Sequence, residues 1–146
     1  MTLKYHFFND YSEGAHPDIL RIIAETNLIQ EDGYGYDSLS RSAERQIKDR
    51  LQQPDAEVHF VAGGTQANML VLAALLRPFE SVIAAGTAHI HVHEAGAVEA
   101  TGHKINTVAS LDGKLTRQLI ESVLNQHTDE HMVKPRAVFI SNSTEL

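Results

Sequence analysis

The chain has 146 residues, a usual length for one domain, and its 42% hydrophobic content is ordinary for a folded protein. With 12 basic against 19 acidic residues and no basic stripe, it is not expected to bind nucleic acid or a membrane surface. It has no cysteine, which excludes disulfides and thiol catalysis, and no apolar leader or run of bilayer length, so we expect a cytoplasmic protein.

Two amphipathic helices are predicted in the first third of the chain. Residues 16–27 place their large aliphatic side chains on one face, and Pro17 suits the first helical position. A polar, glycine-bearing loop follows. Residues 38–53 then repeat apolar side chains at i+4 intervals, with Ser38 or Ser40 as the expected N-cap.

The rest of the chain alternates between strand and helix patterns. Strands alternating with helices predict an α/β fold with a mostly parallel sheet and helices on both faces. The last predicted strand is followed by no covering helix, so residues 1–146 are expected to be a single, incomplete domain. The predicted strands are 58–61, 81–86, 104–109 and 136–141; the predicted helices begin near Thr65 and span 116–127; a short helix or turn is predicted at 93–102 and a turn at 112–115.

Gly63, Gly64 and Thr65 lie where the first predicted strand meets its helix. The N-terminus of a helix presents unpaired N–H groups and a favourable dipole, and glycines let a ligand approach the backbone, so the junction suits a phosphate. No lysine follows the glycines, and the spacing is not that of a dinucleotide fingerprint. A plain glycine turn before a helix capped by Thr65 remains open as the alternative.

His89, His91 and His93 form an unusual cluster. In a strand all three would share a face, as metal ligands do; in a helix His89 and His93 would pair at i, i+4. Neither a thiolate nor a well-spaced carboxylate completes a ligand set, so we predict no metal site. An imidazole at this place is also suited to stacking on an aromatic cofactor and to proton transfer.

Taken together and in order, these segments resemble the threonine aldolases, which are pyridoxal-phosphate enzymes of the β-eliminating lyase group with the aspartate-aminotransferase-like fold. The resemblance runs from about residue 8 to the end. It implies the N-terminal portion of a fold-type I large domain, and a carbon–carbon lyase that cleaves threonine or allo-threonine to glycine and an aldehyde. The blocks that carry it are FNDYSEGAHPDIL, GYGYDSLS, FVAGGTQANMLVLAALLRPFESVI, AHIHVHEAGAVEATGHKI, DGKLT and VFISNSTEL.

The resemblance also implies roles for individual residues. Gly64 and Thr65 match the positions that bind the phosphate of pyridoxal 5'-phosphate, and His89 matches the imidazole that stacks on its ring and assists deprotonation of the substrate's β-hydroxyl. Tyr34 matches a loop residue that reaches an active site across a subunit interface. Asn9 stands near the substrate carboxylate, where serine is usual in the family.

Other features of the resemblance concern assembly and completeness. Glu94 resembles an acid that recurs near the family's site, and a local cap or ion pair is its preferred interpretation here. The family's cofactor-anchoring lysine lies downstream, and no lysine of this chain has the matching context, so the chain alone is expected to be inactive. The family implies an amino-acid substrate and a homodimer or homotetramer. Alternatives are another amino-acid lyase of the same fold, a non-catalytic truncated module and a histidine-dependent metal hydrolase.

Overall fold

The computed structural model describes residues 9 and 11–145. The chain divides into two compact units, Met1–His59 and Phe60–Leu146. In the part of the chain described here, no helix is long and apolar enough to cross a bilayer.

The first unit contains the two predicted helices, α1 (Pro17–Thr26) and α2 (Ser38–Leu51). Pro17 lies at the start of α1, as predicted, because a first-turn position does not need the N–H group that proline lacks. The N-cap of α2 is Asp37, whose carboxylate accepts a hydrogen bond from the backbone N–H of Ser40 at 2.6 Å. The prediction of a serine cap was therefore wrong: the charged acceptor takes the cap and the serine supplies the donor.

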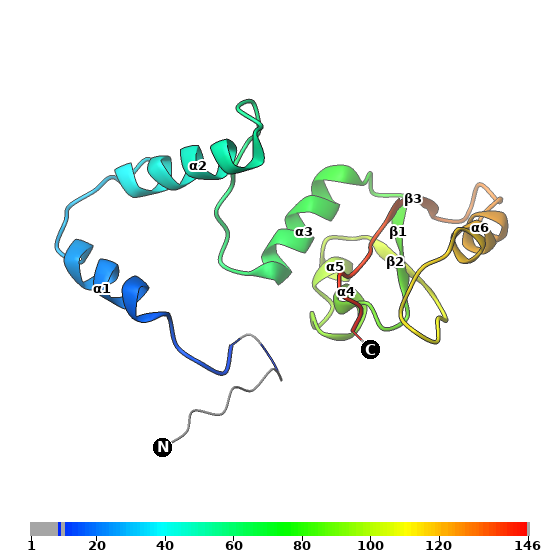
Figure 1. Ribbon diagram of the computed structural model, residues 1–146. Helices are drawn as coiled ribbons and strands as arrows, with labels where there is room; N and C mark the ends of the chain where they lie inside the picture. Colours follow the sequence, from blue (N-terminus) through cyan, green and yellow to red (C-terminus); the bar gives the residue numbers. More distant parts are fainter. Residues whose placement is uncertain (1–8, 10, 146) are drawn as a thin grey trace, which may run out of the picture. The chain divides into compact units, whose positions relative to one another are not determined.

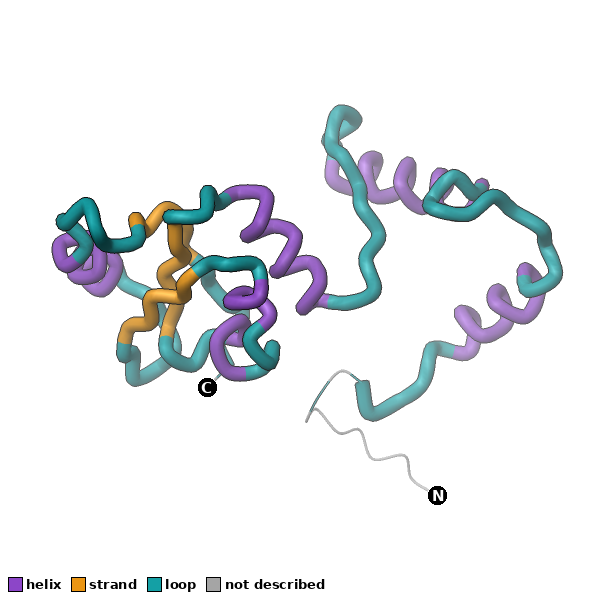
Figure 2. Tube along the Cα trace, turned by 180° about the vertical axis from the view of Figure 1, so that it is seen from behind, coloured by secondary structure: helices purple, strands orange, loops and turns teal. Residues whose placement is uncertain are grey.

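The second unit is built on three parallel strands in the order β2-β1-β3 (Figures 1 and 2). The strands are β1 (Glu80–Ala85), β2 (Lys104–Val108) and β3 (Lys134–Val138). β1 is the central strand, and every one of its residues is buried. It pairs in unbroken register with β2, whereas its pairing with β3 shifts between Ser81 and Val82.

Helices cover both faces of this sheet, which confirms the predicted fold class (Figure 1). Alternate residues of β1 point to opposite faces: Val82 and Ala84 join the core beneath the first group of helices, whereas Ile83 packs with Val108 and Val123 beneath the other. The first group is α3 (Gly64–Leu75), α4 (His89–Val92) and α5 (Ala97–Ala100), and the other face carries α6 (Arg117–Gln126).

Three further local predictions about strands and burial differ from the structure. Residues 58–61 form no strand, although their composition favours one: the described strands pair only among themselves, and an extended segment without a partner forms no ladder. β3 covers residues 134–138 instead of 136–141. The apolar spacing of residues 116–127 predicts that Val123 and Leu124 both face inward; in α6 Val123 is buried, but Leu124 is exposed.

Candidate functional site

The candidate site begins where β1 ends and α4 starts. Parallel strands present ligand-binding groups at their carboxyl ends, and His89 is the first residue of the helix that follows β1. The next residue, Ile90, is 1% exposed and anchors α4 in the core, while 43% of the His89 side chain remains exposed. The backbone therefore fixes the position of an imidazole whose ring stays accessible.

The open question about residues 89–93 is resolved in favour of a helix. The rings of His89 and His93 lie one turn apart, with centroids 5.5 Å from each other and planes tilted by 56°. His91 and His93 are both exposed. Among the described residues there is no group of three or more histidine and carboxylate side chains placed to hold a metal ion.

The second component is the N-terminus of α3. The N-cap is Gly63, with extended backbone (φ −179°) and no side-chain cap, so the interpretation that Thr65 caps this helix was wrong. The first-turn N–H groups of Gly64 and Thr65 have no acceptor within an α-helix. Apart from the adjoining residues and the backbone of α3 itself, a Cβ added at Gly63 or Gly64 would meet no described atom within 4 Å. The turn therefore offers open backbone and unpaired donors, which fit an anionic group such as a phosphate.

A buried carboxylate connects these two components. Oε1 of Glu94 lies 2.8 Å from Nδ1 of His89 and accepts a hydrogen bond from Nδ2 of Asn68 at 2.5 Å. Asn68 is on α3, one turn after Thr65. The same oxygen thus ties the first turns of α3 to the imidazole on α4, and α4 and α5 lie beside α3 in Figures 1 and 2. The preferred interpretation of Glu94 as a local pairing residue is confirmed.

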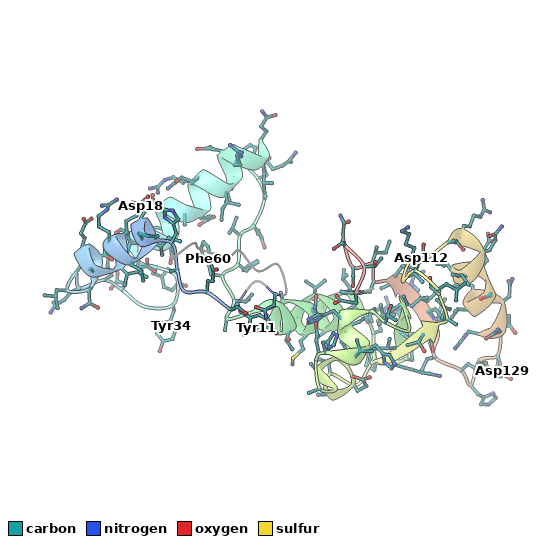
Figure 3. All side chains as sticks on the ribbon, turned by 60° about the horizontal axis from the view of Figure 1, so that its bottom comes forward. Tyr11, Asp18, Tyr34, Phe60, Asp112 and Asp129 are labelled. Carbon is teal, nitrogen blue, oxygen red and sulfur yellow. The ribbon has the colours of Figure 1, made fainter. Side chains whose placement is uncertain are left out.

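The two other predicted site residues belong to the Met1–His59 unit. Oδ1 of Asn9 accepts hydrogen bonds from the backbone N–H of Tyr11 and the hydroxyl of Ser12, which places Asn9 in a turn ahead of α1. Tyr34 is fully exposed in the loop between α1 and α2, and its ring points away from that loop (Figure 3). Tyr34 and Gly35 both have positive φ, at the centre of a turn closed by a hydrogen bond from Tyr36 N–H to the Gly33 carbonyl.

Asn68 is the site residue that the sequence did not single out. It is the last residue of the GGTQAN block, so the motif included it, but its role depends on a contact with Glu94 across 26 positions. The resulting arrangement combines a helix terminus with unpaired N–H donors, an accessible imidazole and a buried carboxylate hydrogen-bonded to that imidazole. This combination is suited to acid–base chemistry on a ligand that carries a phosphate.

Comparison with known proteins adds three findings. A family model described as beta-eliminating lyase matches residues 18–146. Low specificity L-threonine aldolases from Pseudomonas aeruginosa and from a Pseudomonas species are each 36% identical to the chain over 142 residues, which is 96% of this chain. The solved structure of a Leishmania major threonine aldolase is 51% identical, with a TM-score of 0.91 over 97% of this chain.

The chain matches less than half of the length of each of these relatives. The chain spans 41% of the length of the two Pseudomonas proteins and 42% of the Leishmania chain.

Proposed function

Because this chain belongs to the β-eliminating lyase family, we propose that it forms the cofactor-binding N-terminal part of a pyridoxal-phosphate-dependent carbon–carbon lyase. The proposed substrate is threonine or allo-threonine, cleaved to glycine and an aldehyde; the names of the similar proteins support this choice. One observation carries the proposal. An uncapped helix N-terminus with open glycines is tied through Asn68 and Glu94 to a half-exposed imidazole.

Each part of this arrangement has a role in the proposal. The N–H groups of Gly64 and Thr65 and the Thr65 hydroxyl hold the phosphate of the cofactor. The accessible ring of His89 stacks on the pyridine and accepts the proton of the substrate's β-hydroxyl. When bound, pyridoxal phosphate supplies the electron sink that makes Cα–Cβ cleavage feasible.

The proposal extends to the first unit and to assembly. Asn9 and Tyr34 contribute to the substrate side of the site, and the complete protein is a cytoplasmic homodimer or homotetramer. Support for assembly comes from α1 and α2: neither helix contains a buried residue, and α1 leaves four large aliphatic side chains about half exposed. Such apolar surface favours an interface. The four side chains are Ile19, Leu20, Ile22 and Ile23.

The phosphate-binding role is tested by titrating the chain with pyridoxal phosphate. Thr65→Val removes the hydroxyl but keeps the side-chain shape, and Thr65→Ser keeps the hydroxyl as the matched control. A hydrogen bond to a charged group contributes about 1.5–3 kcal/mol, so we expect Thr65→Val to weaken binding by about 10- to 150-fold. Thr65→Ser is expected to bind nearly as the wild type does. Equal affinity of all three proteins would contradict the proposed cradle.

The reaction is tested with the complete protein. We expect release of an aldehyde and glycine from threonine or allo-threonine, measured with a coupled aldehyde reduction. Release of ammonia in place of the aldehyde would assign a different amino-acid lyase reaction. The 146-residue chain alone is expected to bind the cofactor without covalent attachment. A borohydride-stable adduct on this chain, detected by mass spectrometry, would contradict that expectation.

A further inference from the structure

Glu94 holds the imidazole of His89 in a defined way, although its side chain lies out of reach of any ligand. The Glu94 side chain is 0% exposed and that of His89 is 43% exposed, with 2.8 Å between Oε1 and Nδ1. We propose that Glu94 is a positioning residue: it keeps the proton of neutral His89 on Nδ1 and thereby leaves Nε2 as the atom that accepts the substrate's proton. This inference rests on the proposed function and deepens it.

The donors around Oε1 determine the direction of this hydrogen bond. The amide of Asn68 donates to the same oxygen at 2.5 Å, so Oε1 acts as an acceptor, and Nδ1 of His89 is the remaining donor. A neutral imidazole with its proton on Nδ1 carries its lone pair on Nε2. Since Nδ1 is engaged by the buried carboxylate, the free lone pair belongs to the accessible side of the ring.

The other histidines of α4 lack this arrangement. Within the described residues, the side chains of His91 and His93 have no hydrogen-bond or ion-pair partner, and both residues are exposed. Their protons are free to occupy either nitrogen. The tautomer is therefore specified at His89 alone among the three, which is the position that stacks on the cofactor in the proposed function.

The backbone that follows the buried Glu94 adopts an uncommon conformation. Ala95 and Gly96 both have positive φ, at 50° and 77°. This conformation is uncommon for a non-glycine residue such as Ala95 and persists where surrounding contacts hold it. The hydrogen bonds from Asn68 and His89 to Glu94 are contacts of that kind. Oε2 of Glu94 is buried without a partner in the described chain, so those two hydrogen bonds are the ones that stabilise this carboxylate.

The arrangement specifies where the proton and electrons go in the proposed reaction. The proton of the substrate's β-hydroxyl moves to Nε2 of His89, and the electron pair of that O–H bond becomes the second bond of the aldehyde carbonyl. The electrons of the broken Cα–Cβ bond remain with the α-carbon, which then takes up a proton to give glycine. The resulting imidazolium is paired with the Glu94 carboxylate through Nδ1, which offsets its charge.

The test is the tautomer of His89, read from long-range ¹H–¹⁵N correlation spectra of the chain labelled with ¹⁵N-histidine. The His89 signals are identified by their loss in His89→Gln. We expect wild-type His89 to show a protonated Nδ1 and a bare Nε2, and Glu94→Ala to lose this preference. Glu99→Ala, which alters an exposed acid on α5, is the matched control and should leave the His89 signals unchanged.

The wild-type spectrum decides the question even where Glu94→Ala fails to fold: a bare Nδ1 in wild-type His89 overturns the inference. An unchanged tautomer in a folded Glu94→Ala variant overturns it as well. In the complete enzyme, Glu94→Ala should lower kcat about 10- to 100-fold with a much smaller change in KM. If the complete enzyme cleaves threonine but Nδ1 of its His89 carries no proton, the positioning role alone is refuted. A protonated Nδ1 without any cleavage would refute the proposed function alone.

Discussion

The burial of Ile90 yields the sharpest prediction about how the imidazole is held in place. Ile90 is 1% exposed and belongs to the core cluster with Val82, Ala84 and Val98. Ile90→Ala removes Cγ1, Cγ2 and Cδ1; at about 0.8 kcal/mol per buried carbon, their transfer accounts for about 2.4 kcal/mol. The cavity left behind adds to this, so we expect the free energy of unfolding to fall by about 3–4 kcal/mol.

The assay is urea denaturation followed by circular dichroism, with the midpoint and the slope compared among variants. Ile90→Val should cost only about 0.5–1.5 kcal/mol, because it removes one methyl group. The matched control is Val92→Ala on the same four-residue helix: Val92 is 46% exposed, so its truncation should change stability by at most about 0.5 kcal/mol. Equal losses for Ile90→Ala and Val92→Ala would refute the argument that Ile90 anchors α4.

Two further predictions concern helix capping and turn geometry. Hydrogen bonding by Ser40, through its side chain and its backbone N–H, lowers the pKa of Asp37 below its ordinary value. The stability that this cap gives α2 is therefore fully present above the ordinary pKa of an aspartate. It is lost as the pH falls through the lowered pKa of Asp37 in the folded protein. Acid titration of helicity by circular dichroism should show this loss, and Asp37→Asn, which caps without titrating, should reduce it. Gly113 and Gly102 both have positive φ, but an added Cβ meets Thr144 Cβ at 3.0 Å only at Gly113; Gly113→Ala should thus lower the thermal midpoint more than Gly102→Ala, and equal shifts would contradict the steric argument.

The helices were predictable from the sequence because their signals are local. The spacing of apolar residues and the position of Pro17 specify α1 without reference to any other segment. Residues 58–61 illustrate the opposite case: their side chains favour a strand, but a strand exists only where a neighbour supplies hydrogen bonds. The cap of α2 was also missed, because Asp37 and two serines all suit that position and the backbone geometry decides among them.

The candidate site was predictable only in part, because only some of its features have local sequence signals. The motif identified the glycine–threonine turn and His89 as separate features, and the structure adds the link between them. That link depends on a buried carboxylate and on Asn68, which lies 26 positions away from it, and periodicity carries no information about such a pairing. The conformation of residues 89–93 was likewise left open by the sequence, because the histidine spacing fits a strand as well as a helix; in the structure residues 89–92 form a helix and Ile90 is buried.

The hydrogen-bond network around Glu94 also bears on the order of folding. Its members come from one continuous stretch, with separations of 26 and 5 positions, and that stretch crosses only the central strand. The entropy lost on closing a loop grows with the length of the loop. Because the members of this network are comparatively near neighbours along the chain, bringing them together costs comparatively little entropy. During synthesis, every residue of the network is made before the residues of β2 and β3. The orientation of the imidazole is thereby encoded early, in a segment that needs no later residue to supply its donors or its acceptor.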